Sequence, residues 1–181
     1  MPRLRRLVSE QLTPDELRAI RRLLADAFAT DEHGGFGEDD WEHALGGVHF
    51  VLDEDGAILA HAAVVERELH VDGRPIRTGY VEAVATAPAH QRRRHGSAVM
   101  VAVSEYISRG FELGALGTSS HAFYEQLGWR TWRGPSSVRT GDGTRPTPDE
   151  DGYILVLRTP SSPPFDLWAD ISCDWRPGDV W

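Results

Sequence analysis

The sequence predicts an α+β domain in which helices flank one mixed β-sheet. The chain has 181 residues, of which 40% are apolar and 26% charged, values that are ordinary for a soluble globular protein. The predicted elements run in the order helix, several strands, helix, strand, helix, strand, which is typical of helices packed on a mixed sheet. Neither an internal repeat nor a linker interrupts this order. We therefore predict a single domain over residues 1–181.

The first helix is predicted over residues 13–28. Thr13 suits the N-cap, Pro14 suits the first turn, and Glu16 completes a capping box. Apolar side chains then recur on one helix face, at Leu17, Ile20, Leu24 and Phe28. The Gly- and acid-rich residues 30–40 are expected to form a loop, and residues 41–45 a short helical turn.

Three strands are predicted next. Residues 49–52 and 57–66 read as strands joined by the turn "DEDG". The turn at Asp72-Gly73 then leads into a third strand over residues 76–86. Strands joined by such short turns pair antiparallel, so we expect a meander.

The second half alternates helices and strands. Residues 97–109 are predicted to form an amphipathic helix whose apolar face carries Val99, Ala102, Val103 and Tyr106. A strand over residues 112–118, a helix over 119–127 that Gly128 stops, a loop over 139–152 and a strand over 153–158 follow. The Pro- and Trp-rich tail from residue 160 carries no predicted element.

The charge of the chain is unevenly distributed. The net charge of -9 argues against nucleic acid as a partner and is compatible with a cationic one. Residues 30–55 hold nine acidic residues and no arginine, whereas residues 88–110 carry a local balance of +3 (four arginines, one glutamate). No apolar stretch suits a membrane span or a signal peptide, so we expect a cytoplasmic protein. A single cysteine, Cys173, excludes an internal disulfide, and without metal-ligand spacing we expect no metal.

The positive charge gathers where a strand passes through a loop into a helix. At such a junction the first helical N–H groups are unpaired and point outward, which favours a bound phosphate. Arg92, Arg93 and Arg94 add full charges, and Gly96 permits close approach to the backbone. The loop lacks the lysine of a Walker motif. For the charge run alone, a solvated arginine turn without a ligand is the alternative interpretation.

A second segment, "AFYEQLGWR", places Tyr124 on a helix four residues before Gly128, with Trp129 following. Together the two segments resemble the GCN5-related N-acetyltransferase superfamily, whose members carry a Q/R-x-x-G-x-G/A loop for the pyrophosphate of coenzyme A. Here Arg94 stands where that loop has its first glycine, a departure from the pattern. The resemblance implies a cofactor site made of Val84, Ala85, Thr86, Gln91, Arg92, Arg93, Arg94, His95, Gly96 and Ser97.

A closer resemblance covers nearly the whole chain. The segments "DWEHALGG", "AILAHAAVV", "GYVEAVA", "YEQLGW", "TPDEDG" and the terminal "CDWRPGDVW" are similar to the aminoglycoside N-acetyltransferases that modify the 2'-amino group. This resemblance implies acetyl-CoA as co-substrate, a cationic aminoglycoside as acceptor and a homodimer. It also implies a substrate site made of Asp40, Glu82, Thr118, Glu150, Asp179 and Trp181, with Asp31, Glu32 and Ser119 as further candidates.

Two residues are candidates for the chemistry of acetyl transfer. An aliphatic ammonium is not nucleophilic, so a base is needed, and Glu82 is the candidate. The family resemblance implies that Glu82 acts through an ordered water or binds the amine itself. Tyr124 is the candidate acid toward the departing sulfur, and a backbone N–H near Val84 would meet the oxyanion. His90, His95 and His121 are interpreted as surface residues. An exposed strand glutamate and a core tyrosine are the structural alternatives.

Three functions remain open at this level. The first is the 2'-N-acetyltransferase. The second is an acetyltransferase of the same fold that acts on a polyamine, a cell-wall amino sugar or a small metabolite. The third is a non-catalytic module that binds acyl-CoA or an antibiotic, which the presence of both Glu82 and Tyr124 disfavours.

Overall fold

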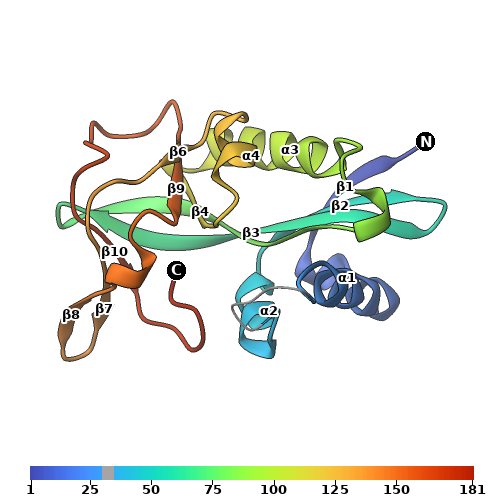
Figure 1. Cartoon of the computed structure of the whole chain (residues 1–181), viewed down its shortest axis with the longest axis horizontal. Coiled ribbons are helices and arrows are strands. Elements are labelled where there is room, and N and C mark those ends of the chain that lie inside the picture. The colour runs from blue at the N-terminus through green and yellow to red at the C-terminus, as the bar shows by residue number, and fades with distance from the viewer. Residues whose placement is uncertain (30–34) are drawn as a thin grey trace. The chain divides into compact units, whose positions relative to one another are not determined.

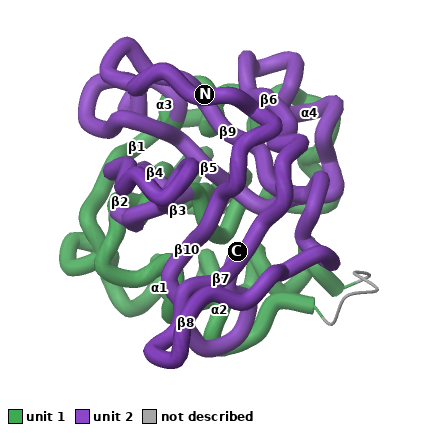
Figure 2. The backbone as a smooth tube through the Cα atoms, turned by 90° about the vertical axis from the view of Figure 1, so that its left-hand side faces the viewer, with its two compact units in different colours: residues 1–65, 81–103 green, residues 66–80, 104–181 purple. Residues whose placement is uncertain are grey.

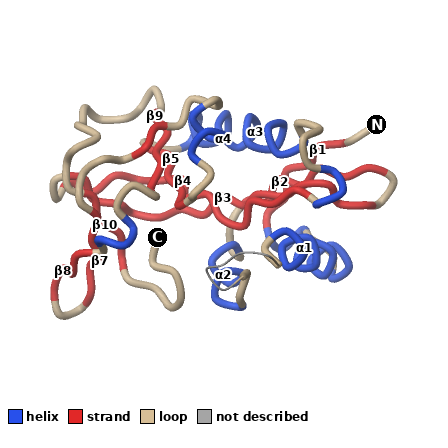
Figure 3. Tube along the Cα trace, in the orientation of Figure 1, coloured by secondary structure: helices blue, strands red, loops and turns tan. Residues whose placement is uncertain are grey.

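The computed structural model describes residues 1–29 and 35–181, so the candidates Asp31 and Glu32 lie outside the described residues. The helices are α1 (Pro14–Ala27), α2 (Glu38–Ala44), α3 (His95–Gly110) and α4 (His121–Glu125) (Figures 1 and 3). The strands are β1 (Arg3–Val8), β2 (Val48–Glu54), β3 (Ala57–Val71), β4 (Arg74–Thr86), β5 (Leu113–Gly117), β6 (Arg130–Thr131), β7 (Ser136–Thr140), β8 (Gly143–Pro146), β9 (Ile154–Arg158) and β10 (Ile171–Asp174). Short 3-10 turns cover η1 (Ser9–Gln11), η2 (Pro88–His90) and η3 (Pro148–Glu150).

The backbone forms two compact units (Figure 2). Unit 1 comprises residues 1–65 and 81–103, and unit 2 comprises residues 66–80 and 104–181. Strands β3 and β4 and helix α3 each pass from one unit into the other. The assignment of residues 1–181 to a single domain stays a prediction.

Unit 1 is built on the strands β1, β2 and β3, which pair antiparallel in that order. Helices α1 and α2 lie on one face of these strands, and the first half of α3 lies on the other (Figure 1). The core on the α1 side gathers apolar side chains from both helices and from β2 and β4, namely Leu12, Ile20, Leu23, Leu24, Trp41, Val51 and Ala85. Burial of this apolar surface is the main force that holds the unit together.

Helix α1 begins as the sequence predicts. The Glu16 N–H donates to Thr13 Oγ1 (3.2 Å), and the Thr13 N–H donates back to Glu16 Oε2 (2.8 Å), so the capping box is confirmed. Arg5 on β1 pairs with both Glu16 (2.7 Å) and Asp53 (2.6 Å), which ties the helix start to the β1–β2 pair.

Unit 2 holds the sheet in the order β6-β9-β5-β4-β3-β10-β7-β8. The β4–β5 and β10–β7 pairs are parallel, whereas β5–β9, β6–β9, β10–β3 and β7–β8 are antiparallel. The predicted mixed sheet flanked by helices is therefore confirmed. The second half of α3 packs closely on β4, because a Cβ added to Gly79 would lie only 2.9 Å from Ile107 and 3.0 Å from Phe111.

The structure differs from the predicted local structure at several points. The predicted loop over residues 139–152 contains the end of β7 and all of β8, and strands β1 and β10 lie in segments without a predicted strand. Helix α2 begins at Glu38, inside the predicted loop. Strand β8 is exposed throughout, so it lacks the alternation that marks a half-buried strand. On α3 the fully buried stripe is Val99, Met100, Val103 and Ile107, rotated from the predicted face.

Candidate active site

The predicted phosphate loop lies in unit 1, before helix α3. The Ala98 N–H donates to Arg94 O (2.9 Å), so the N–H groups of His95, Gly96 and Ser97 precede the hydrogen-bonded ladder of the helix. Gln91 and the three arginines that follow it are exposed. Free helical N–H groups and exposed guanidinium groups together suit an anion.

The backbone of this loop is left-handed at two arginines. Arg92 has a φ of 59° and Arg94 a φ of 65°, a region that favours glycine. Arg94 stands at the position where the superfamily loop has its first glycine, so the side chain departs from the pattern while the backbone keeps a glycine-like conformation. Left-handed residues in a turn direct successive backbone N–H groups into a concavity that binds anions.

The candidate base lies on β4 in unit 1, beside a third left-handed residue. Ala83 has a φ of 53°, and Glu82, Ala83 and Val84 are half-buried between the buried Val81 and Ala85. A left-handed residue interrupts the regular alternation of a strand, so Glu82 and Val84, on either side of Ala83, are not held to the same face of the sheet by strand geometry. The carbonyl oxygen of Ala83 accepts a hydrogen bond from His61 Nδ1 (2.8 Å).

Three other predicted residues of unit 1 have local structural contacts. Ala85 belongs to the core, so its side chain is not open to a ligand. Thr86 is half-buried at the end of β4. Asp40 lies in the first turn of α2, and its Oδ2 accepts the Gly37 N–H (2.8 Å), which is a capping contact.

The candidate acid lies on α4 in unit 2. Tyr124 is buried, and its ring packs edge-on against Phe123 and Trp129, with ring centroids 4.8 and 6.3 Å apart. The Trp129 indole N–H donates to Ser104 Oγ (3.1 Å), which fixes this packing. Burial raises the pKa of Tyr124 well above that of an ordinary tyrosine, so the phenol keeps its proton at neutral pH.

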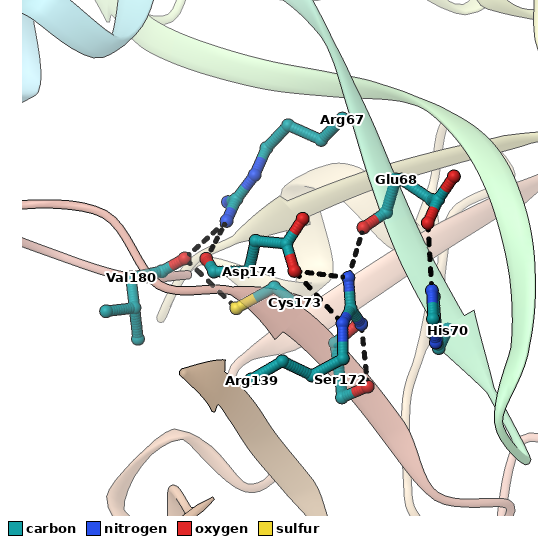
Figure 4. Close-up of polar contacts among 8 residues, drawn as sticks. All are labelled: Arg67, Glu68, His70, Arg139, Ser172, Cys173, Asp174 and Val180. Carbon is teal, nitrogen blue, oxygen red and sulfur yellow. Dashed lines mark hydrogen bonds and ion pairs between the residues drawn. The ribbon is translucent and has the colours of Figure 1, made fainter. Parts of the chain in front are cut away.

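The C-terminal tail is anchored in unit 2 by two arginines (Figure 4). Arg67 donates from Nη2 to the carbonyl oxygens of Val180 (2.8 Å) and Asp174 (3.2 Å), and the Cys173 thiol also donates to Val180 O (3.2 Å). Arg139 bonds to Asp174 Oδ1 (3.0 Å) and to Ser172 O (2.8 Å). The last residues are therefore held in a defined position.

Trp181 is held by bonds at three different atoms. Its indole N–H donates to Thr147 Oγ1 (3.0 Å), its backbone N–H donates to Asp179 Oδ1 (3.0 Å), and its O atom accepts from Arg176 Nη2 (3.2 Å). The residue is only 3% exposed. A Cβ added to Gly117 would lie 3.8 Å from the backbone carbon of Trp181, so the terminus lies beside the end of β5.

The acidic candidates of unit 2 meet at this terminus. Burial, and then the charges of Asp179 and Asp149, raise the pKa of Glu150. Tyr153 links the remaining parts, because its N–H donates to Glu150 O (3.0 Å) and its carbonyl accepts the Thr118 N–H (2.9 Å). We call Asp149, Glu150, Asp179 and the carboxylate of Trp181 the terminal acid cluster. Such a concentration of carboxylates suits a polycation.

Comparison with known proteins identifies the family. A family model described as an acetyltransferase (GNAT) domain matches residues 9–132. An aminoglycoside 2'-N-acetyltransferase from Mycolicibacterium fortuitum is 40% identical over 177 residues, which cover 96% of this chain and 89% of that protein. The chain belongs to the aminoglycoside 2'-N-acetyltransferase family within the GNAT acetyltransferases.

Solved structures show the same fold at low identity. A GNAT family acetyltransferase from Brucella melitensis, in complex with acetyl-CoA, has a TM-score of 0.64 at 18% identity and covers 94% of each chain. The ribosomal-protein-S18-alanine N-acetyltransferase from Escherichia coli has a TM-score of 0.60 at 21% identity, covering 92% of this chain and 97% of that one. These likenesses concern the GNAT fold alone.

Several residues of this acetyltransferase that the sequence did not single out hold other parts of the protein in place. Arg67, Arg139 and Arg176 position the tail, and the fully buried His49 and His61 reach the carbonyl beside Glu82. His90, His95 and His121, interpreted from the sequence as surface residues, are all half-buried, and His121 Nε2 lies 2.7 Å from Gly152 O. Within the described ranges, no group of three or more His, Cys, Asp or Glu could hold a metal ion. No helix in the described part of the chain is long and apolar enough to cross a membrane.

Proposed function

We propose that this acetyltransferase transfers the acetyl group of acetyl-CoA to the 2'-amino group of aminoglycosides. The observation that carries the proposal is the terminal acid cluster, which gathers carboxylates around a fixed C-terminus in unit 2. Aminoglycosides are polycations, and clustered carboxylates raise both their capture rate and their affinity. The name of the Mycolicibacterium fortuitum relative supports the same acceptor.

Acetyl-CoA supplies the activated acetyl group as a thioester. The start of α3 fits its pyrophosphate, because free N–H groups, two left-handed residues and exposed arginines occur together there. Gln91, Arg92, Arg93, Arg94, His95, Gly96 and Ser97 would hold the phosphates, and the backbone of Val84, Ala85 and Thr86 would hold the chain that carries the thioester.

Glu82 would remove the proton from the acceptor amine, directly or through a water molecule. A lysine-type ammonium has a pKa of about 10.4, so the amine is largely protonated at neutral pH and needs a base. The amine nitrogen then forms the new C–N bond at the acetyl carbon, and the N–H of Val84 would donate to the oxyanion that develops on the acetyl oxygen.

Tyr124 would return a proton to the departing sulfur as the C–S bond breaks. Its raised pKa keeps the phenol protonated until the thiolate forms. The acceptor nitrogen loses two protons in all, because an ammonium becomes a neutral amide. Glu82 takes the first; the second leaves as the C–S bond breaks and, through solvent, replaces the proton that Tyr124 gives to sulfur. The products are the neutral amide, the free thiol of coenzyme A and one proton held by Glu82.

The acceptor would be held by the terminal acid cluster, with Thr118 offering a hydroxyl. Asp40, on α2 of unit 1, stays a further candidate carboxylate for the acceptor. Bound ammonium groups would favour the ionised form of Glu150, whose pKa is raised in the free protein. We also propose that the enzyme is a homodimer, as the family resemblance implies, and light scattering would test this. We further propose that it is located in the cytoplasm, which cell fractionation would test.

The matched pair kanamycin B and kanamycin A tests the proposed function, because kanamycin B has an amine at the 2' position where kanamycin A has a hydroxyl. We expect thiol release from acetyl-CoA with kanamycin B and none with kanamycin A. Equal turnover of both would mean that another amine is acetylated. Binding of both ligands without turnover would instead indicate a non-catalytic module.

A further inference from the structure

A buried chain of hydrogen bonds crosses unit 1 and ends beside Glu82. Ser9 Oγ lies 2.8 Å from His49 Nε2, His49 Nδ1 lies 2.9 Å from His61 Nε2, and His61 Nδ1 lies 2.8 Å from Ala83 O. We call Ser9, His49 and His61 the histidine chain. Both histidines are fully buried. Buried polar groups are costly unless they are paired, so a fully bonded pair of histidines is a specific feature.

Chemistry fixes the direction of every bond in the histidine chain. A carbonyl oxygen only accepts, so His61 must carry its proton on Nδ1 and donate it to Ala83 O. In a neutral ring His61 Nε2 is then an acceptor, which requires a proton on His49 Nδ1. His49 Nε2 in turn accepts from the Ser9 hydroxyl, whose oxygen receives the Gly46 N–H (2.9 Å). All donors therefore point toward Ala83.

The charge state is fixed by the same surroundings. Burial lowers the pKa of His49 to about 4 and that of His61 to about 3, so both rings are neutral at the pH of an assay. The negative charge of Glu10 raises the pKa of His49, but the lowering of this pKa by burial is larger. Because both rings are neutral and every donor points the same way, the histidine chain keeps its hydrogen bonds without a counter-ion.

The end of the chain is a strained backbone position. Ala83 is left-handed in the middle of a strand, a conformation that is strained for a residue other than glycine. Such a conformation persists only where its surroundings impose it. Here the methyl group packs against the apolar core of unit 1 and the carbonyl is held by His61. The flanking residues are Glu82 and Val84.

We propose that the histidine chain is a positioning device that fixes the Ala83 carbonyl and thereby the directions of the Glu82 side chain and the Val84 N–H. His49 and His61 are positioning residues, because neither touches a reacting atom. The inference rests on the proposed function, since Glu82 and Val84 act in acetyl transfer only there. A small misdirection of a base and an oxyanion donor is costly, because a displacement of about 1 Å can cost about 100-fold in rate.

The kinetic test compares His61→Leu with His61→Asn in the full-length protein. Leucine removes both ring nitrogens, whereas the asparagine amide can still donate to Ala83 O from near the position of Nδ1. With kanamycin B as acceptor, we expect kcat to fall by about tenfold or more in His61→Leu, with the KM of acetyl-CoA changed less than about threefold. His61→Asn should recover most of the loss. Ser9→Ala, which removes the outermost bond of the histidine chain together with the acceptor of the Gly46 N–H, should lower kcat by about twofold.

Thr159→Val is the matched control, because it removes a buried hydroxyl that donates to Phe111 O (2.8 Å) in unit 2. It should lower thermal stability and leave kcat unchanged. Unchanged kcat in His61→Leu would overturn the positioning role. Equal losses of kcat in His61→Leu, His61→Asn and Thr159→Val would overturn it too, because a general loss of stability would then explain them.

A second test needs neither a variant nor activity. Nitrogen-15 NMR of the wild-type protein reports which ring nitrogen carries the proton, and we expect the Nδ1–H form at both His49 and His61 between pH 5.5 and 8. An Nε2–H form at His61 would overturn the inference whether or not the protein acetylates amines. If no amine is acetylated while both rings are Nδ1–H, the proposed function fails and the histidine chain stands as described.

Discussion

The loop before α3 and the C-terminal tail are opposite solutions to binding a charged molecule. In the loop, three exposed arginines stand on a backbone that is left-handed at Arg92 and Arg94. In the tail, carboxylates meet around a nearly buried Trp181 that is bonded at three atoms. The loop combines strained backbone with exposed cations, whereas the tail combines fixed backbone with closely spaced anions. A long phosphate-bearing carrier suits the first, and a rigid polycation suits the second.

The largest effect should fall outside both regions, on the proposed acid. Tyr124→Phe should lower kcat by about 100-fold or more while changing both KM values by less than about threefold, because general acid catalysis contributes about 10²–10⁴-fold. Steady-state kinetics by thiol release measure this. Tyr153→Phe, on an exposed tyrosine of unit 2, is the control and should behave like wild type. An unchanged kcat in Tyr124→Phe would remove the acid role.

The loop is tested by removing one of its arginines. Arg93→Ala should raise the KM of acetyl-CoA by about tenfold, since a hydrogen bond to a charged group is worth about 1.5–3 kcal/mol. The KM of the aminoglycoside should change by less than about twofold. Arg109→Ala removes an exposed arginine from the other end of α3 and should change neither value. If Arg93→Ala raised the KM of the aminoglycoside more than the KM of acetyl-CoA, the loop would be assigned to the aminoglycoside instead.

The tail is tested by deleting its last residue. Without Trp181 the contacts to Thr147, Asp179 and Arg176 are lost, so the terminal acid cluster loses its fixed geometry. We expect the aminoglycoside Kd to rise by about tenfold and the coenzyme A Kd by less than about twofold. Calorimetric titration with each ligand distinguishes the two. Selective weakening of coenzyme A would contradict the placement of the acceptor at the tail.

The pH dependence of aminoglycoside binding sharpens the comparison further. The raised pKa of Glu150 means that this group is partly protonated at pH values where an ordinary glutamate is ionised, above its reference pKa of 4.5. The neutral form attracts ammonium groups less, so affinity should rise as pH increases from 5 to 7, by about threefold. Glu150→Gln should flatten this rise. A rise of the same size in the Glu150→Gln variant would show that another group titrates.

The smallest effect concerns the strained backbone of the loop. Arg94→Gly relieves a left-handed position at which a side chain costs about 1–2 kcal/mol, although glycine also gains freedom in the unfolded chain. We expect the free energy of unfolding to rise by about 0.5 kcal/mol and the KM of acetyl-CoA to rise by about threefold. Urea unfolding and initial rates measure the two changes. A loss of stability would show that the arginine side chain stabilises this turn.

Much of the framework could be predicted because local chemistry determines it. The capping box of α1, the turns at Asp55-Gly56 and Asp72-Gly73, and the junction before α3 each depend on residues close together in the sequence. The β7–β8 hairpin and β10 could not be predicted, since short or exposed strands carry no hydrophobic periodicity.

The histidine chain could not be predicted from the sequence for a different reason. A regular hairpin that pairs Glu54 with Ala57 would place His49 opposite Ala62, and His61 would then face the other side of the sheet. A register shift after Leu52 instead pairs His49 with Ala63, which brings His61 to the same face on a diagonal. No turn residue signals this bulge, so the pairing of the two rings follows only from the three-dimensional structure.

Separation of charge between the two binding regions is tested most directly by calorimetry on two double variants. We predict that Arg93→Ala with Arg94→Ala weakens coenzyme A by at least about tenfold and kanamycin B by less than about twofold, and that Glu150→Gln with Asp179→Asn does the opposite. If either double variant weakens both ligands equally, or weakens the ligand assigned to the other region, the assignment of anion binding to the loop and cation binding to the tail is contradicted.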